Sequence, residues 1–194
     1  MPLLTESPPK GIEKVLDHAV SELVGHGALA LGGRDRPAVS APIRVYNIGA
    51  DAIAAGSGLS AAQPTGWLST LTTNGEVRGT IELVPQKATA RKSAHADALR
   101  LGAFTTGPLQ RALAAAVDAA GKAAGRSQVQ IAIVRVPALY LLALWLREKG
   151  SDRLLPIAPC PAPLKAGEPY PAERALAELR ATAAAVAKID DTRS

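Results

Sequence analysis

The apolar run at 136–146 constrains the fold more than any other part of this 194-residue sequence. A helix that crosses a bilayer needs about 20 consecutive apolar residues, so the run is too short to span a membrane. It is apolar on both faces as a strand and all round as a helix, so in either form it belongs in the core. We favour a strand, because the polar turn REKGSD (147–152) and the short apolar run RLLPIA (153–158) follow and complete a hairpin. A helix remains the alternative, since Leu, Ala and Trp prefer strands less than Val and Ile do.

Another hairpin is predicted around Asn74-Gly75, a dipeptide typical of two-residue type I′ turns. The pairing that this turn implies sets Leu71 opposite Arg78 and Trp67 opposite Glu82. The second strand alternates between an apolar set (Val77, Gly79, Ile81, Leu83) and a polar set (Glu76, Arg78, Thr80, Glu82). In this register Trp67 and Leu71 fall on the polar face, which is anomalous for two large apolar side chains.

Three amphipathic helices are predicted from apolar residues that recur at helical spacing. The first begins at Ile12 and ends before Gly25, the second begins near Pro108 and ends at 121–125, and the third begins at Pro171. Strands are predicted at 43–48 and at 128–136, where the apolar positions change parity after Ile133 and indicate a bulge. The segments at 26–42 and 86–100 are predicted to be connections.

The strands come in consecutive groups and do not alternate strictly with helices, which predicts an α+β fold. We expect an antiparallel or mixed sheet of about five or six strands, including two hairpins, with three amphipathic helices packed on it. Residues 1–10 are predicted to form a flexible N-terminal tail, and 11–190 a single α+β domain.

Composition favours a soluble cytoplasmic protein. Hydrophobic residues make up 47% and charged residues 20% of the chain, as in ordinary folded proteins. Cys160 is the only cysteine, which excludes an intramolecular disulfide and a cysteine-based zinc site. The N-terminus lacks the regions of a signal peptide. Abundant Ala, Gly, Pro and Arg suggest a bacterial source.

Motifs for catalysis are present only in part. The segment GSGLSA (56–61) matches a dinucleotide-binding turn, but Pro64 and the hairpin that follows replace the helix such a turn requires. Ser60 resembles the serine of a nucleophile elbow, G-x-S-x-G, but Ala62 replaces the second glycine and no His with a local signature of a base is present. His95 with Asp97 is a weak acid–base or metal pair in a basic segment. Cys160 lies between prolines, which remove N–H groups that would stabilise a thiolate. We predict no cofactor and no metal.

Lys87, Arg91 and Lys92 form the predicted anion-binding patch. The net charge of +5, from 22 Lys and Arg against 17 Asp and Glu, gives only mild attraction to anions. Nucleic-acid binding is not favoured, because the chain lacks stacking aromatics and a recognisable nucleic-acid-binding unit.

We therefore predict a non-enzymatic protein that binds a protein partner or forms a homo-oligomer. The predicted partner-binding residues are Trp67, Leu71 and Arg78, because an aromatic side chain flanked by charges is typical of interface anchors. The competing explanation is that a helix covers Trp67. The alternative function is a small-molecule-binding protein or enzyme whose site forms only in three dimensions, near the basic segment at 86–100.

Overall fold

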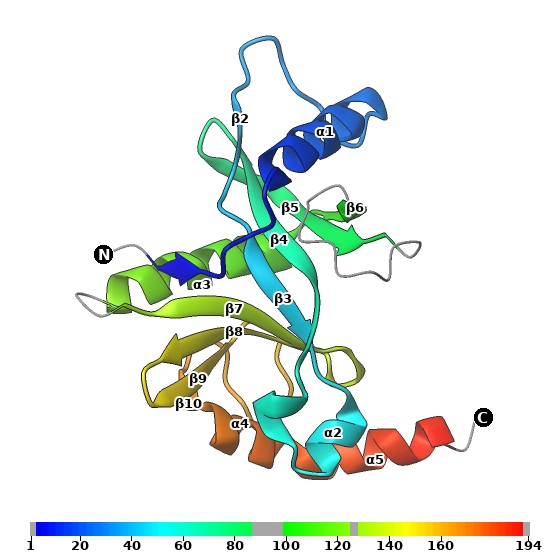
Figure 1. Ribbon diagram of the computed structural model, residues 1–194, viewed down its shortest axis with the longest axis vertical. Coiled ribbons are helices and arrows are strands. Elements are labelled where there is room, and N and C mark those ends of the chain that lie inside the picture. Colours follow the sequence, from blue (N-terminus) through cyan, green and yellow to red (C-terminus); the bar gives the residue numbers. More distant parts are fainter. Residues whose placement is uncertain (1–2, 87–98, 125–127, 192–194) are drawn as a thin grey trace.

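The computed structural model describes residues 3–86, 99–124 and 128–191 (Figure 1). In this part of the chain one mixed sheet of ten strands carries five α-helices. The predicted α+β class and mixed sheet are confirmed, whereas the predicted number of strands and helices is too low.

The strands are β1 (Leu4–Thr5), β2 (Pro37–Val39), β3 (Ile43–Asn47), β4 (Gln63–Thr73), β5 (Glu76–Pro85), β6 (Leu99–Thr105), β7 (Gln130–Val136), β8 (Leu141–Glu148), β9 (Ser151–Pro156) and β10 (Tyr170–Pro171). The helices are α1 (Ile12–Gly25), α2 (Ala50–Ala54), α3 (Pro108–Ala124), α4 (Ala172–Glu178) and α5 (Arg180–Asp191), with short 3-10 turns η1 (Gly58–Ala61) and η3 (Pro137–Leu139).

The main path of the sheet runs in the order β10-β9-β8-β7-β3-β4-β5-β6, with β1 also paired to β7 and β2 to β4. β3 and β1 run parallel to β7, and the other neighbours pair antiparallel. Residues 4 and 5, which lie within the predicted N-terminal tail, form β1. β2 and the last residues of β4 extend the sheet toward α1, at the top of Figure 1.

The central strand β7 is buried on both faces. Ile131 and Ile133 belong to the cluster that packs under α3, while Ala132 and Val134 belong to the cluster that packs under α2, α4 and α5. The change of apolar parity after Ile133 therefore reflects two covered faces. The predicted bulge is wrong, because β7 pairs with β8 without a shift of register.

The apolar run at 136–146 spans the end of β7, η3 and most of β8. The strand interpretation is confirmed for Leu141 onward, and so is the second hairpin, since β8 pairs with β9 across the turn at 149–150. Tyr140 departs from the prediction. Its φ of 54° is left-handed and its side chain is 87% exposed.

The predicted third helix is two helices, α4 and α5, which are separated at Leu179. Leu179 is fully buried beside Ala175 and Ala183. The short helix α2 was not predicted. It packs against α5 in the lower part of Figure 1, where both cover the same face of the sheet as α4.

The turn at Asn74-Gly75 is confirmed, with left-handed φ values of 53° and 84°. Next to this turn the predicted pairing of Thr73 with Glu76 is confirmed. From Leu71 toward the start of β4 the predicted register is wrong, because a bulge between Leu71 and Thr72 shifts it by one residue. The shift sets Leu71 opposite Gly79, where Arg78 was predicted.

The same shift sets Trp67 opposite Leu83, where Glu82 was predicted. Trp67 and Leu71 thereby join the apolar face of β5 and pack in the cluster under α1. They are 4% and 0% exposed, so the explanation that a helix covers Trp67 is confirmed. The bulge removes the anomaly that the ideal register created.

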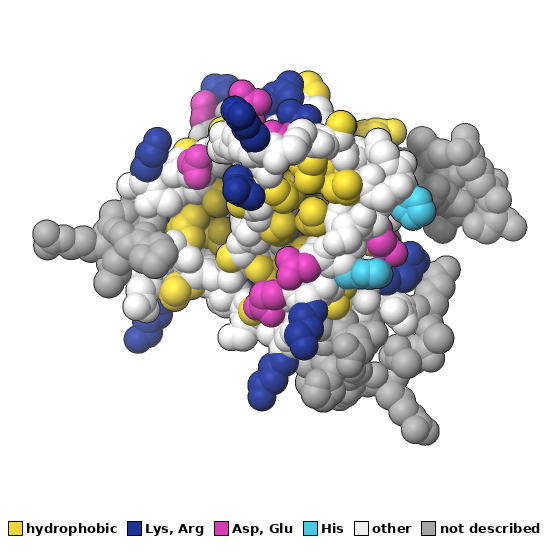
Figure 2. Space-filling model, turned by 90° about the horizontal axis from the view of Figure 1, so that it is seen from above, with side chains coloured by type: hydrophobic (Ala, Val, Ile, Leu, Met, Phe, Trp, Pro, Cys, Tyr) yellow, Lys and Arg dark blue, Asp and Glu magenta, His cyan; other side chains and the backbone are white. Residues whose placement is uncertain are grey.

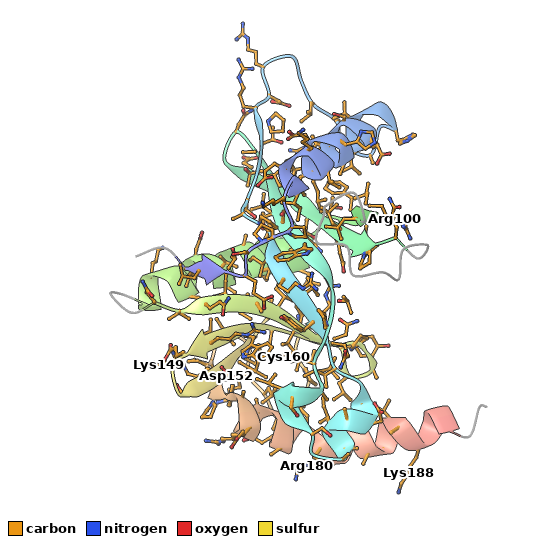
Figure 3. The ribbon with its side chains drawn as sticks, viewed as in Figure 1. Arg100, Lys149, Asp152, Cys160, Arg180 and Lys188 are labelled. Carbon is orange, nitrogen blue, oxygen red and sulfur yellow. The ribbon has the colours of Figure 1, made fainter. Side chains whose placement is uncertain are left out.

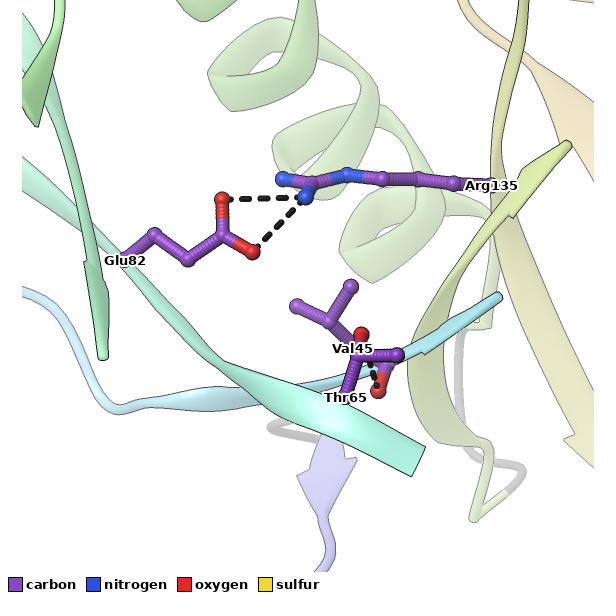
Figure 4. A network of polar contacts seen from close by, with 4 residues as sticks. All are labelled: Val45, Thr65, Glu82 and Arg135. Atoms are coloured by element: carbon purple, nitrogen blue, oxygen red, sulfur yellow. Dashed lines mark hydrogen bonds and ion pairs between the residues drawn. The ribbon is translucent and has the colours of Figure 1, made fainter. Parts of the chain in front are cut away.

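An ion pair crosses the α3 face of the sheet (Figure 4). Nη1 of Arg135 on β7 lies 2.8 and 2.9 Å from the two carboxylate oxygens of Glu82 on β5. Beneath the pair, the Thr65 hydroxyl donates to the Val45 carbonyl oxygen at 3.4 Å. The pair thus joins strands that are separated by β3 and β4 in the sheet.

The N-terminal segment is fastened to the opposite face by Glu6. Its Oε1 accepts from Arg147 Nη1 at 2.6 Å and from the Tyr46 hydroxyl at 2.5 Å. The Arg147 guanidinium lies 3.6 Å from the centre of the Trp145 ring, and the Tyr46 and Trp145 rings meet edge-on at 5.5 Å. One carboxylate therefore links β1 to side chains of β3 and β8.

Within the part of the chain that the structure describes, no helix combines the length and the apolar character that crossing a membrane requires.

Candidate functional site

The predicted partner-binding residues do not form one exposed surface. Trp67 and Leu71 are buried under α1, and Arg78 is exposed on β5 where the bulge occurs. Partner binding through Arg78 stays a prediction. The predicted anion-binding residues Lys87, Arg91 and Lys92, together with His95 and Asp97, lie outside the described residues.

The glycine-rich segment at 56–61 lines a pocket of about 950 Å³. The pocket lies between η1, the turn that joins β8 to β9, and α4. Arg180 packs over Gly56, where an added Cβ would lie 2.9 Å from the guanidinium. Asp152, Glu173 and Arg180 on the rim are exposed, and Figure 3 shows Asp152 and Arg180 in the lower part of the molecule.

This pocket lacks the groups that hydrolysis by Ser60 would require. The Ser60 hydroxyl donates to the Ser57 carbonyl oxygen at 2.5 Å, and the described residues that line the pocket include no His. Among the residues described, no three His, Cys, Asp or Glu side chains come together as a metal site.

Cys160 is half-buried in the segment after β9. Its thiol donates to the Leu164 carbonyl oxygen at 3.3 Å. Burial raises the pKa of the Cys160 thiol above its usual value, and a backbone hydrogen bond from Ala166 opposes this more weakly. A raised pKa leaves less thiolate at neutral pH, as expected of a structural cysteine.

A groove of about 530 Å³ lies between α1 and β6. One wall is a stripe of α1 residues three or four positions apart, which therefore share one flank of the helix. The other wall is Gln86, which directly follows β5, with the first three residues of β6. The lining residues are Gly11, Lys14, Val15, His18, Ala19, Glu22, Gln86, Leu99, Arg100 and Leu101.

The amphipathic pattern of α1 explains why this flank borders a groove. Ile12, Leu16 and Leu23 point into the core, so the stripe through Lys14 and His18 lies beside the buried face and is exposed. Leu99 is buried in the same cluster as α1. The floor of the groove is thus apolar and its rim is charged.

β6 is the last strand of the main path, and in the described chain it pairs with β5 alone. A Cβ added to Gly66 would lie 2.4 Å from the Leu83 carbonyl oxygen, so this oxygen points toward β4. The N–H and C=O of one strand residue point to the same side of an antiparallel ladder. Leu101, which lies opposite Leu83, therefore directs its own N–H and C=O away from β5.

Arg100 wraps around this outer edge. Alternation places its side chain on the face opposite Leu99 and Leu101, yet its Nη1 donates to the Leu101 carbonyl oxygen at 3.3 Å. The guanidinium therefore covers an acceptor that no neighbouring described strand uses. Figure 3 shows Arg100 beside α1, in the upper part of the molecule and far from Lys149 and Lys188.

Charges in the groove are predominantly positive. Glu22 lies 3.4 Å from Nε2 of His18. In the described chain, neither Lys14 nor Arg100 has a carboxylate oxygen within 4.0 Å. Among the described residues, the groove thus presents two cations, Lys14 and Arg100, that have no carboxylate within 4.0 Å, and one carboxylate, Glu22, that lies beside His18.

On the other side of α1 the surface is more apolar. Figure 2 looks onto the end of the molecule that carries α1 and β2, where hydrophobic side chains gather in a hollowed middle ringed by charged ones. Val24 on α1 is 40% exposed, and Leu31 and Val39 are half-buried. Such a surface favours contact with another molecule but does not distinguish between partners.

β6 and its groove were not predicted from the sequence. The segment at 86–100 was predicted to be a basic connection, and the alternation of Leu99, Arg100 and Leu101 was too short to indicate a strand. This alternation is the one local signal for the strand, and two apolar positions are too few for a prediction.

Comparison with family models, with curated proteins and with solved structures found no match to this chain.

Proposed function

We propose that this chain binds another protein by receiving an extended segment of it as an additional strand at β6. The observation that carries the proposal is the outward-facing backbone of Leu101 beside the groove between α1 and β6. In strand addition, main-chain hydrogen bonds supply affinity and neighbouring pockets supply specificity. The groove offers such a pocket, with Val15, Ala19 and Leu99 at its base.

The pairing of β5 with β6 limits the length of the added strand. The register shifts between Glu82 and Leu83, which leaves Gly102 as an extra residue on β6. A bulge twists an edge and interrupts regular pairing. The regular part beside the groove is Leu99, Arg100 and Leu101, so we expect a short contact and weak, reversible binding.

The larger pocket supports this function less well. It has mixed charges on an exposed rim and, among its described lining residues, no base for Ser60. The groove at β6 also includes Gln86, Leu99 and Arg100, the described residues of the range 86–100.

The test uses Leu101→Pro and the matched control Leu101→Ala. Proline removes the outward N–H of Leu101 and is tolerated on an edge strand whose N–H faces solvent, while alanine removes only the side chain. Peptides are first selected from a random decapeptide display library on the immobilised full-length chain, and their affinities are then measured by fluorescence anisotropy.

We expect Leu101→Pro to weaken the selected peptides at least about tenfold, the effect of losing one main-chain hydrogen bond and its alignment. Leu101→Ala is expected to change affinity much less, and thermal melting of both variants checks that they fold. Failure to enrich any peptide over a blank surface, or equal binding to Leu101→Pro, would contradict the proposal.

A further inference from the structure

We infer that the segment bound at β6 carries an acidic side chain, which pairs with the cations of the groove. This inference rests on the proposed binding at β6 and adds the chemistry of the partner. Its two supports are the position of Arg100 and the distribution of charge around it.

Arg100 already donates to the backbone carbonyl oxygen with which an incoming strand would have to form a hydrogen bond. Its Nη1 donates to the Leu101 carbonyl oxygen at 3.3 Å, and that oxygen faces the outer edge of β6. A main-chain N–H of the incoming strand has to replace the guanidinium there. Arg100 is exposed, so water can accept from the displaced guanidinium, but an acceptor on the incoming segment compensates the lost hydrogen bond better.

A carboxylate is the acceptor that suits a displaced guanidinium best. It accepts two parallel N–H bonds from arginine and carries a full negative charge, whereas the neutral Leu101 carbonyl oxygen accepts one bond from Nη1. A carboxylate on the bound segment thus draws Arg100 away and leaves the Leu101 oxygen to the new strand. An amide of the same shape offers one neutral oxygen and displaces Arg100 less well.

The rest of the groove favours the same charge. Lys14 lines it from α1, and within the described chain neither Lys14 nor Arg100 has a carboxylate oxygen within 4.0 Å. Glu22, the one acidic residue of the lining, lies 3.4 Å from His18. Among the described lining residues, an acidic segment therefore meets two cations and a single carboxylate.

A second copy of this chain fits the groove less well. It brings the same Arg100 in its own β6 and the same net charge of +5. Like charges disfavour association through one surface. We therefore assign the groove to an acidic segment of a different protein.

The experiment reads the composition of the peptides selected on the full-length chain. Selection is repeated on Arg100→Gln, on Arg100→Glu and on the control Lys149→Gln, which changes an exposed cation in the β8–β9 turn away from the groove. The tightest peptide from the unmodified chain is then synthesised with Glu and with Gln at each acidic position, and both forms are titrated at low and high salt.

We expect Asp and Glu to be enriched on the unmodified chain and on Lys149→Gln, and to lose this advantage on Arg100→Gln. On Arg100→Glu we expect Lys and Arg to take their place. The change from Glu to Gln in the peptide should weaken binding about tenfold at low salt and less at high salt.

The outcomes separate the two proposals. Enriched peptides without an excess of Asp and Glu, or an acidic preference that persists in Arg100→Glu, overturn the inference and leave strand addition standing. Absence of any enrichment overturns strand addition itself. Equal melting temperatures of the variants establish that altered binding does not result from unfolding.

Discussion

Glu82 and Arg135 show how single residues acquire a structural role that only the folded sheet reveals. Their side chains are 18% and 27% exposed, so both charges have lost much of their water. The carboxylate accepts at both oxygens from one guanidinium nitrogen, at 2.8 and 2.9 Å. Each charge is therefore tolerated at its position mainly because the other is present.

Removal of Arg135 should consequently destabilise the fold. We expect Arg135→Ala to lower the free energy of unfolding by about 1–3 kcal/mol, because it leaves the Glu82 carboxylate half-buried without its partner. Combining it with Glu82→Ala should recover part of that loss. Urea unfolding measures both effects. As a control, Arg111→Ala changes an exposed residue of α3 and should stay within about 0.5 kcal/mol.

An Arg135→Ala variant as stable as the unmodified chain would show that solvent screens the pair.

Neither member of this pair was a candidate from the sequence, because 53 positions separate them. Residue-scale predictions succeeded only where the reason was local. Asn74 and Gly75 adopt the left-handed backbone that their types permit.

At the scale of elements, one extra residue in β5 decides which face of β4 is buried. Strand faces alternate with a period of two, so a shift of one residue exchanges them. Without the bulge, Trp67 and Leu71 lie among charges; with it, they pack against Ile81 and Leu83 in the cluster under α1. The bulge is therefore a requirement of the core, and a prediction from ideal pairing cannot contain it.

Trp67→Ala tests this burial. We expect it to lower the free energy of unfolding by about 3–5 kcal/mol, because a large core side chain is replaced by a cavity. The stacking of Arg44 over the indole ring, 4.8 Å from its centre, is lost as well. Chemical unfolding gives the stability, and light scattering gives the mass in solution.

The milder Trp67→Phe keeps the prediction measurable if Trp67→Ala does not fold, and it should cost less because most of the volume is retained. A stable Trp67→Ala variant with reduced mass would instead place Trp67 in an interface between copies of the chain.

Elements with a long regular pattern were predictable from the sequence, and elements defined by their neighbours were not. The patterns of α1 and α3 extend over 14 and 17 residues, enough for helical spacing to be recognised. β7 showed mixed parity because helices cover both of its faces. β1 and β10 contain two residues each, and strands this short exist only through pairing with an adjacent strand.

At the scale of the whole molecule, the candidate site joins segments that are distant in the sequence. Its described walls come from residues 11–22, from Gln86 and from residues 99–101, which meet because α1 packs on the sheet end formed by β4, β5 and β6. A groove of this origin has no sequence motif. An amphipathic helix and a basic segment were predicted from the sequence, but their positions relative to each other were not.

The N-terminal segment connects β1, which pairs with the central strand β7, to α1, which forms one wall of the groove. The Leu4 N–H donates to the Val129 carbonyl oxygen at 2.9 Å, which places β1 along β7, and α1 begins at Ile12, seven positions after Thr5. Glu6 stands between these elements and bonds to Arg147 and Tyr46. The path of the chain into α1, and hence one wall of the groove, therefore depends on this carboxylate.

Glu6→Gln should weaken that link without changing its shape. We expect the free energy of unfolding to fall by about 1–2 kcal/mol, because Arg147 keeps a half-buried guanidinium and loses its charged partner. Trp145 fluorescence should respond as well, since the guanidinium lies 3.6 Å from the centre of its ring. The control Glu13→Gln alters an exposed carboxylate of α1 outside the groove lining and should leave both quantities nearly unchanged. If hydrogen exchange of the amides in β1 is no faster in Glu6→Gln than in the control, strand pairing alone holds the N-terminal segment and the carboxylate contributes little to its position.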